Sequence, residues 1–296
     1  MRLAMHNWMR VEPLETTIAR LARYGYDSIE INGELEQWDV GDTRRLLDEY
    51  GVSCWGVVPS MFGTRSLVAA SEQDRASSVA YVKACARFLA DTGGEVLMLI
   101  PGTIGVVIPT SDPDDEWRWL VESTTEINDF ARSVGVRVAV EPINRFETYV
   151  INRIDQALAL CDAVGDDVGV AVDTFHMNIE EDDLYAAISR AGSRILDVHV
   201  ADNNRMPAGL GSIDWERVLK SLEEVGYDGP LAAEFVANVD RTPANRYPGA
   251  LETDLDKLDI DPMQRQFIID HGSTILTESF YDWMTKMNAQ YLRGLG

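Results

Sequence analysis

Cysteine and histidine are scarce in this sequence. Three cysteines, Cys54, Cys85 and Cys161, and four histidines occur among 296 residues. The cysteines are odd in number, lie inside predicted strands or helices and have no paired spacing, which argues against a disulfide framework and against a sulfur-rich zinc site. We therefore expect buried free thiols in a reducing cytoplasm.

Long apolar runs and positive charge are also lacking. No run approaches the roughly 20 apolar residues of a membrane span, and the first residues contain no apolar stretch typical of a signal peptide. With 26 basic against 49 acidic residues, the net charge is −23, so the chain lacks a basic patch for nucleic acid and would be repelled by an anionic membrane. We expect a soluble, cytoplasmic protein that binds a neutral or cationic small molecule.

Short apolar segments alternate with amphipathic helical ones along the chain, which predicts parallel βα units. No G-x-G-x-x-G fingerprint follows the first strand, so a closed (β/α)8 TIM barrel is favoured over an open doubly wound sheet. We expect one domain over residues 1–296. Eight strands are predicted near residues 2–5, 27–32, 52–58, 95–100, 136–141, 168–173, 194–200 and 230–235, and glycines end several of the helices between them (Gly25, Gly51, Gly135 and Gly226).

Polar side chains stand at the ends of the last four predicted strands. They are Glu141, Asp173, His199 and Glu234. Because ligands of parallel α/β folds gather at the carboxyl ends of the strands, these side chains should converge on one point. Three carboxylates and one imidazole suit Mn²⁺, Mg²⁺ or Co²⁺ and leave coordination positions open for substrate oxygens. A single acid at a strand end often only caps a helix or pairs with arginine, but four at equivalent positions predict a metal site.

Four segments around these residues resemble the xylose isomerase-like sugar isomerase and epimerase superfamily, in particular its tagatose, psicose and ribulose 3-epimerases. The segments are EPINRFE at 141–147, DTFHMNIEE at 173–181, HVADNNRMPAGLGSIDW at 199–215, and GYDG leading to Glu234. The resemblance covers about residues 1–236. It implies that Glu141, Asp173, His199 and Glu234 bind one divalent metal, Mn²⁺ in the first place, and that Glu141 and Glu234 are the proton-transferring pair.

The resemblance also implies that Glu147, His176 and Arg205 contact substrate oxygens near the carbonyl. The chemistry is consistent with it, because a hydrogen beside a carbonyl can be removed at neutral pH only if the enediolate charge is stabilised, which a metal can do. Two carboxylates on opposite faces of the substrate could then invert the stereocentre. The structural alternatives are a capping role for His176 and a solvated loop position for Arg205.

The predicted substrate is a non-phosphorylated keto-sugar, since no phosphate-binding glycine pattern or basic cluster lies near the last two strands. We therefore expect a ketose 3-epimerase or isomerase that forms a homo-oligomer. His6, Asn7 and Trp8 follow the first strand, where they could line the pocket floor or simply plug the barrel rim.

The segment 237–272 departs from the simple epimerases, because it inserts an acidic, proline-containing stretch before a last helix predicted at about 273–293. Loops of this length are often lids or partner surfaces. An alternative function is therefore a lyase that eliminates the aglycone of 3-keto-glycosides, such as the catalytic subunit of a C-glycoside deglycosidase with a small β-rich partner. Both reactions begin with the same proton abstraction.

Two other classes are disfavoured. A multi-metal endonuclease of the same superfamily would need more histidines and a basic face, which the charge of −23 contradicts. A non-catalytic sugar-sensing or assembly subunit would be expected to have lost one of the four ligands, and all four are present.

Overall fold

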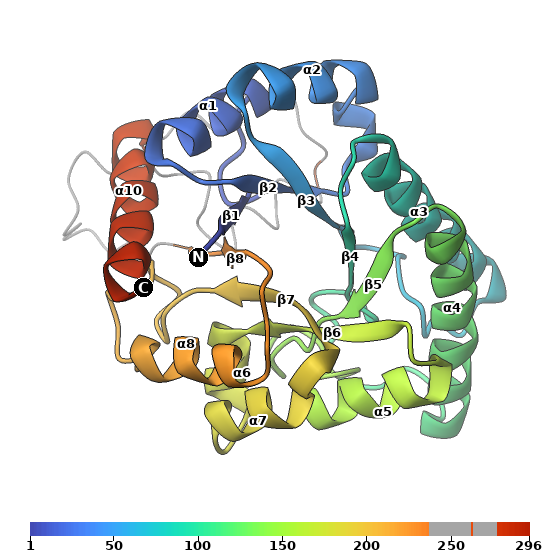
Figure 1. The fold of residues 1–296 in the computed structure, drawn as a ribbon. Helices are drawn as coiled ribbons and strands as arrows, with labels where there is room; N and C mark the ends of the chain where they lie inside the picture. Colours follow the sequence, from blue (N-terminus) through green and yellow to red (C-terminus); the bar gives the residue numbers. More distant parts are fainter. Residues whose placement is uncertain (237–261, 263–276) are drawn as a thin grey trace, which may run out of the picture.

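The computed structural model describes residues 1–236, 262 and 277–296. Eight parallel strands pair in sequence order, and the first pairs with the last, so that the sheet closes into a barrel (Figure 1). The strands are β1 (Leu3–His6), β2 (Ser28–Asn32), β3 (Ser53–Val58), β4 (Val96–Leu99), β5 (Arg137–Val140), β6 (Val168–Asp173), β7 (Ile195–Val200) and β8 (Leu231–Ala233).

Helices surround the barrel on the outside (Figure 1). They are α1 (Leu14–Tyr24), α2 (Val40–Tyr50), α3 (Glu72–Asp91), α4 (Pro113–Ser133), α5 (Ile154–Val164), α6 (Thr174–Glu180), α7 (Leu184–Ala191), α8 (Trp215–Glu224) and α10 (Glu278–Leu295), with short 3-10 turns η1 (Leu35–Gln37) and η2 (Gly192–Arg194). The predicted TIM barrel is thereby confirmed. The last helix begins at Glu278 rather than near 273, because Thr277 is its N-cap and accepts from the backbone of Phe280.

Local sequence explains why the elements begin and end where they do. The side chains of Asp39, Ser71, Asp112 and Asp214 accept hydrogen bonds from backbone N–H groups in the first turns of α2, α3, α4 and α8. The four glycines predicted to end helices all have positive φ, between 65° and 81°, a conformation that is costly for other residues. The strands between them are almost entirely buried, and most of their side chains are apolar.

The remaining expectations about the fold have mixed outcomes. Cys54, Cys85 and Cys161 are free and buried, as predicted. Among the described residues, no helix is both long and apolar enough to cross a bilayer. The insertion predicted at 237–272 lies outside the described residues apart from position 262, and the assignment of residues 1–296 to a single domain stays a prediction.

Helix α10 is attached to α1 by a buried ion-pair cluster. Arg20, only 2% exposed, forms ion pairs with Glu12 and Asp282 and lies over the ring of Tyr281. The hydroxyl of Tyr26 donates to the carbonyl of Thr285 over 3.0 Å. The C-terminal helix is therefore held to the start of the chain, next to the seam where β1 meets β8.

Replacing Arg20 with Met should lower the free energy of unfolding by about 3 kcal/mol, because it removes the buried cation that joins Glu12 to Asp282. Within the described part of the chain, each of these carboxylates then keeps only one arginine, which is more exposed, as its ion-pair partner. Urea denaturation followed by circular dichroism measures this change. Arg45→Met is a matched control, since Arg45 pairs with Glu49 on the exposed face of α2 and its loss should cost less than about 1 kcal/mol. Equal effects of the two substitutions would contradict the importance of the buried cluster.

Candidate active site

The four predicted metal ligands lie together at the carboxyl ends of β5 to β8. Glu141 and Glu234 directly follow β5 and β8, Asp173 is the last residue of β6, and His199 is the penultimate residue of β7. Each is at most 6% exposed, and each offers one ligand atom within 4.8 Å of the others. The convergence predicted from strand spacing is therefore present.

Close polar contacts connect His199 to the carboxylates around it. Its Nδ1 is 2.9 Å from Oε1 of Glu141 and 3.4 Å from Oε2 of Glu234. Burial alone would lower the pKa of His199, but nearby carboxylates, Glu141 and Glu30 first among them, raise this pKa well above its ordinary value. The nitrogen that faces the cluster is thus in a strongly negative environment.

Asp173 and Glu234 titrate differently because their neighbours differ. Burial raises the pKa of Asp173 to about 6, although His176 and Arg205 oppose the rise. Burial would also raise the pKa of Glu234, but interactions with His6, Arg205 and His199 outweigh it and keep this pKa well below the usual range. Glu234 is therefore ionised at neutral pH, as a metal ligand or a general base must be.

The donor set fits a divalent cation. Three carboxylates and one imidazole match the oxygen and nitrogen ligands preferred by Mn²⁺, Co²⁺ and Mg²⁺. The buried Oε2 of Glu234 has no hydrogen bond to any described residue, although Arg205 Nη2 lies 3.5 Å away. An atom of this kind needs a partner, and a cation shared with the other ligands would provide one.

Two hydrogen-bond donors converge beside this cluster. Nδ1 of His176 accepts a hydrogen bond from the backbone N–H of Asn144 over 3.3 Å, from which we infer that the ring proton is on Nε2. That Nε2 is 3.4 Å from Nη1 of Arg205, which also lies 3.4 Å from Oδ2 of Asp173. Two donors in this arrangement are suited to hold one substrate oxygen between them.

The loops that carry these donors are fixed by further contacts. Asn144 donates from Nδ2 to Oε1 of Glu147 over 2.7 Å, so that one amide contacts both Glu147 and His176. Arg205 has φ 61°, which is unusual for a residue other than glycine, and its carbonyl accepts from the N–H of Val236 over 2.7 Å. The guanidinium lies 4.4 Å above the ring of Phe175. All three predicted substrate-binding residues are thus at the site, held in place by their neighbours.

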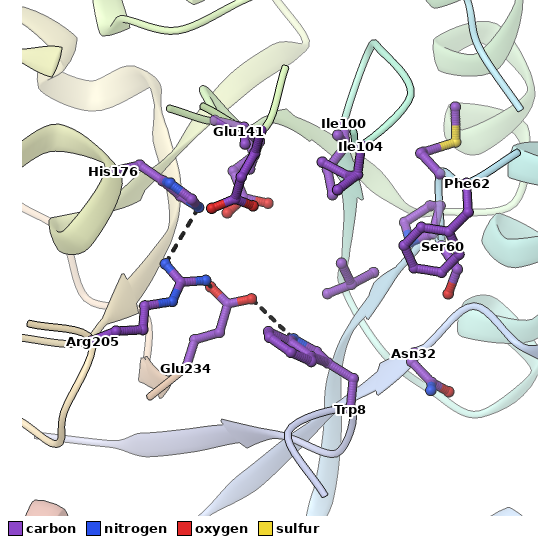
Figure 2. A pocket seen from close by; sticks show the side chains of 15 residues that line it. Trp8, Asn32, Ser60, Phe62, Ile100, Ile104, Glu141, His176, Arg205 and Glu234 are labelled. Carbon is purple, nitrogen blue, oxygen red and sulfur yellow. Dashed lines mark hydrogen bonds and ion pairs between the residues drawn. The ribbon is translucent and has the colours of Figure 1, made fainter. Parts of the chain in front are cut away.

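A pocket of about 690 Å³, counted with its open mouth, lies in front of the cluster. In Figure 2, the carboxylates of Glu141 and Glu234 point toward each other across it, with Arg205 and His176 on one side and the apolar side chains of Phe62, Ile100 and Ile104 on the other. The described lining residues are Trp8, Asn32, Val58, Pro59, Ser60, Met61, Phe62, Ile100, Ile104, Glu141, Ile143, Glu147, His176, Arg205 and Glu234.

The three residues after the first predicted strand have separate roles. Trp8 lines the pocket, and its indole N–H donates to Oε1 of Glu234 over 2.9 Å. Asn7 accepts from the backbone N–H of Asn32 and so fixes the end of β2. His6 is fully buried in the barrel, 4.5 Å from His199 between ring centroids, and burial lowers its pKa to about 3.

Sequence reasoning missed several polar residues of the site. Asn144 belongs to the EPINRFE segment, yet its structural role was not predicted. Glu30 and Asp197 are fully buried inside the barrel, and burial together with Asp197 raises the pKa of Glu30 to about 8. A signal was available for Asp197, because it precedes His199 by two residues in one strand and so faces the same side of the sheet.

Comparison with known proteins agrees with this geometry. Residues 18–254 match the model of the xylose isomerase-like TIM barrel family. The chain belongs to this family. It is 30% identical over 228 residues to the D-psicose 3-epimerase of Agrobacterium fabrum, a match that covers 73% of this chain and 77% of that protein. It is 38% identical over 126 residues to the D-psicose 3-epimerase of Ruminiclostridium cellulolyticum, which is 42% of this chain and 43% of that protein.

Solved structures of epimerases share the fold. The D-psicose 3-epimerase of Clostridium cellulolyticum H10, solved with D-tagatose, superposes with a TM-score of 0.80 at 23% identity and covers 100% of this chain and 99% of its own. A 3-keto-D-glucoside 4-epimerase of E. coli gives a TM-score of 0.73 at 23% identity, over 82% and 95% of the two chains. The solved structures share the fold, and the sequence relatives place the chain among the sugar epimerases and isomerases of its family, so it is an enzyme.

Proposed function

We propose that this enzyme is a divalent-metal-dependent 3-epimerase of a non-phosphorylated ketose. The observation that carries the proposal is the facing of Glu141 and Glu234 across the pocket while both belong to one ligand cluster with Asp173 and His199. The 3-epimerase relatives support the same reaction. Mn²⁺ is the cation proposed first, with Co²⁺ or Mg²⁺ as alternatives.

A cation bound by these four residues would polarise the substrate carbonyl and stabilise negative charge on its oxygen. Glu141 and Glu234 would act as the proton-transferring pair. One carboxylate removes the proton from the carbon beside the ketone, and the other returns a proton on the opposite face, which inverts that carbon. Trp8 keeps Glu234 in place through its hydrogen bond to the Oε1 atom.

His176 and Arg205 would hold the ketone oxygen as charge develops on it. The Nε2–H of the imidazole and the guanidinium both donate, and in a buried pocket such donors stabilise an oxyanion more strongly than water does. Glu147, held by Asn144, would accept from a neighbouring hydroxyl group. Of the described residues that line the pocket, Arg205 alone carries a permanent positive charge, which supports a substrate without phosphate.

The alternative function is action on 3-keto-glycosides, and the fold shared with a 3-keto-D-glucoside 4-epimerase supports it. A lyase of this kind would use the same base and then expel the aglycone. The partner predicted with the lyase is a small β-rich subunit in a hetero-oligomer, whereas the epimerase hypothesis predicts a homo-oligomer.

Incubation with free ketohexoses and, separately, with a 3-keto-glucoside distinguishes these hypotheses. With Mn²⁺ in D₂O, we expect D-psicose and D-fructose to interconvert and to gain deuterium at carbon 3, as read by proton NMR. Release of the aglycone from the glycoside without any ketose epimer would support the lyase instead. Turnover of neither substrate class would contradict the proposal.

A further inference from the structure

A group of buried polar side chains lies beneath His199 inside the barrel. Asp197 of β7, Glu30 of β2 and His6 of β1 are each fully buried. Nε2 of His199 is 2.9 Å from Oδ2 of Asp197 and 3.3 Å from Oε2 of Glu30. Nε2 of His6 is 3.1 Å from the same Glu30 oxygen. The proposed ligand His199 therefore has carboxylates on the edge of its ring that faces away from the pocket.

The tautomer of His199 decides whether it can bind a cation. Its Nδ1 faces Glu141, in the proposed ligand cluster, at 2.9 Å. A neutral histidine binds a metal through the lone pair of one nitrogen, so Nδ1 has to be free of its proton and the ring proton has to be on Nε2. An acceptor beside Nε2 favours this tautomer, and the nearest one is Oδ2 of Asp197.

Asp197 is held so that this oxygen stays available. The indole N–H of Trp55 donates to Oδ1 over 2.7 Å in a buried setting. Oδ2 of Asp197 and Nε2 of His199 are both buried. Among the described residues, neither atom has a partner with which both the distance and the angle of a hydrogen bond are satisfied. Buried polar atoms need partners, and the 2.9 Å between these two atoms is the length of a hydrogen bond.

We propose that Asp197 is a positioning residue that accepts the Nε2 proton of His199, fixes its metal-binding tautomer and thereby strengthens cation binding. The proposal deepens the metal-dependent function proposed above and rests on it. Acceptors of this kind typically change metal affinity by about 10- to 100-fold when they are removed.

Asp197→Asn tests the proposal, because asparagine keeps the size but has a single acceptor oxygen for two donors. If the amide oxygen faces Trp55, the amide NH₂ faces His199 and selects the tautomer that has its proton on Nδ1. If the amide oxygen faces His199, the amide NH₂ faces the indole N–H of Trp55, and two donors then meet without an acceptor. Either outcome weakens binding, and we expect the Kd for Mn²⁺ to rise about 10- to 100-fold. The loss of the free six-line EPR signal on titration of Mn²⁺ alone measures this Kd.

The double variant Trp55→Phe, Asp197→Asn separates the hydrogen-bond role from charge. Without the indole N–H of Trp55, the amide oxygen can face His199, because the amide NH₂ on the other side no longer meets a second donor. We therefore expect the double variant to bind Mn²⁺ at least about fivefold more tightly than Asp197→Asn. Trp55→Phe alone should stay within about threefold of the wild type, since Asp197 keeps both its oxygens.

Asp202→Asn is a matched control for the loss of a buried aspartate. Asp202 is also fully buried and accepts from an indole, that of Trp215 over 3.0 Å, but its other recorded partners are backbone N–H groups. We expect a lower melting temperature and a Mn²⁺ affinity within about threefold of the wild type. Circular dichroism shows whether each variant is folded.

The outcomes separate this inference from the function on which it rests. If the wild type does not bind Mn²⁺, the metal-dependent function fails. If the wild type binds and Asp197→Asn binds equally well, the proposed role of Asp197 fails alone. A weakened Asp197→Asn that Trp55→Phe does not rescue would also overturn it, because the effect would then come from charge rather than from the tautomer.

Discussion

Replacement of Glu234 with Gln is expected to lower kcat for epimerisation by about a thousandfold, and Glu141→Gln should do the same. Proton transfer by a positioned side chain typically contributes about 10²- to 10⁴-fold, and an amide cannot accept the proton from the substrate carbon. Glu234 is ionised in its buried position because His6, Arg205 and His199 keep its pKa low. Glutamine is uncharged and cannot accept the substrate proton, so it cannot replace either glutamate.

Exchange of substrate hydrogen with D₂O, followed by NMR, is the direct measurement for both variants. Exchange retained in both would rule out the glutamate pair. Because each glutamate is also a proposed ligand, the assays use Mn²⁺ at concentrations that saturate each variant in the EPR titration. Glu126→Gln is a control with unchanged activity, since Glu126 is an exposed partner of Lys83 on the outside of the barrel.

Removal of the metal with a chelator should lower activity by more than about a hundredfold, and Mn²⁺ or Co²⁺ should restore it best. The carbonyl polarisation that a cation provides is worth several kcal/mol, and each 1.4 kcal/mol changes the rate by about tenfold. The carboxylates of Glu141, Asp173 and Glu234 are buried around one point, and Arg205 is the nearby permanent cation. A divalent ion would compensate their remaining negative charge.

Binding of Mn²⁺ should also stabilise the fold. A ligand at a hundred times its Kd adds about 2.7 kcal/mol to the free energy of unfolding, so we expect the melting temperature to rise by roughly 5 °C in saturating Mn²⁺. Asp173→Asn should abolish most of this rise. A chelated enzyme with full activity, or a melting temperature that does not respond to Mn²⁺, would contradict the metal-dependent function.

The barrel and the ligand cluster could be predicted because they depend on repetition along the chain. Each strand of a parallel barrel ends at the same rim, so Glu141, Asp173, His199 and Glu234 had to converge once the strands were placed. The alternation of apolar runs and amphipathic helices was sufficient for that placement. Helix-ending glycines added independent support, since their positive φ values occur where expected.

Glu30 and Asn144 were missed because their roles depend on contacts between residues far apart in sequence, which no local pattern encodes. Glu30 on β2 approaches His199 on β7 although the residues are far apart in sequence. Asn144 acts through a loop conformation that brings it to His176. A carboxylate inside a strand also contradicts the expected apolar pattern, and such exceptions are most common at functional sites.

The division of the pocket between two walls has a consequence for how substrate preference could change. The proposed acid–base and metal residues lie at the carboxyl ends of β5 to β8, whereas Phe62, Ile100 and Ile104 follow β3 and β4. Different stretches of the gene therefore encode reactivity and shape. Evolution or laboratory libraries could remodel the loops after β3 and β4 to admit other sugars without altering the groups proposed to transfer protons.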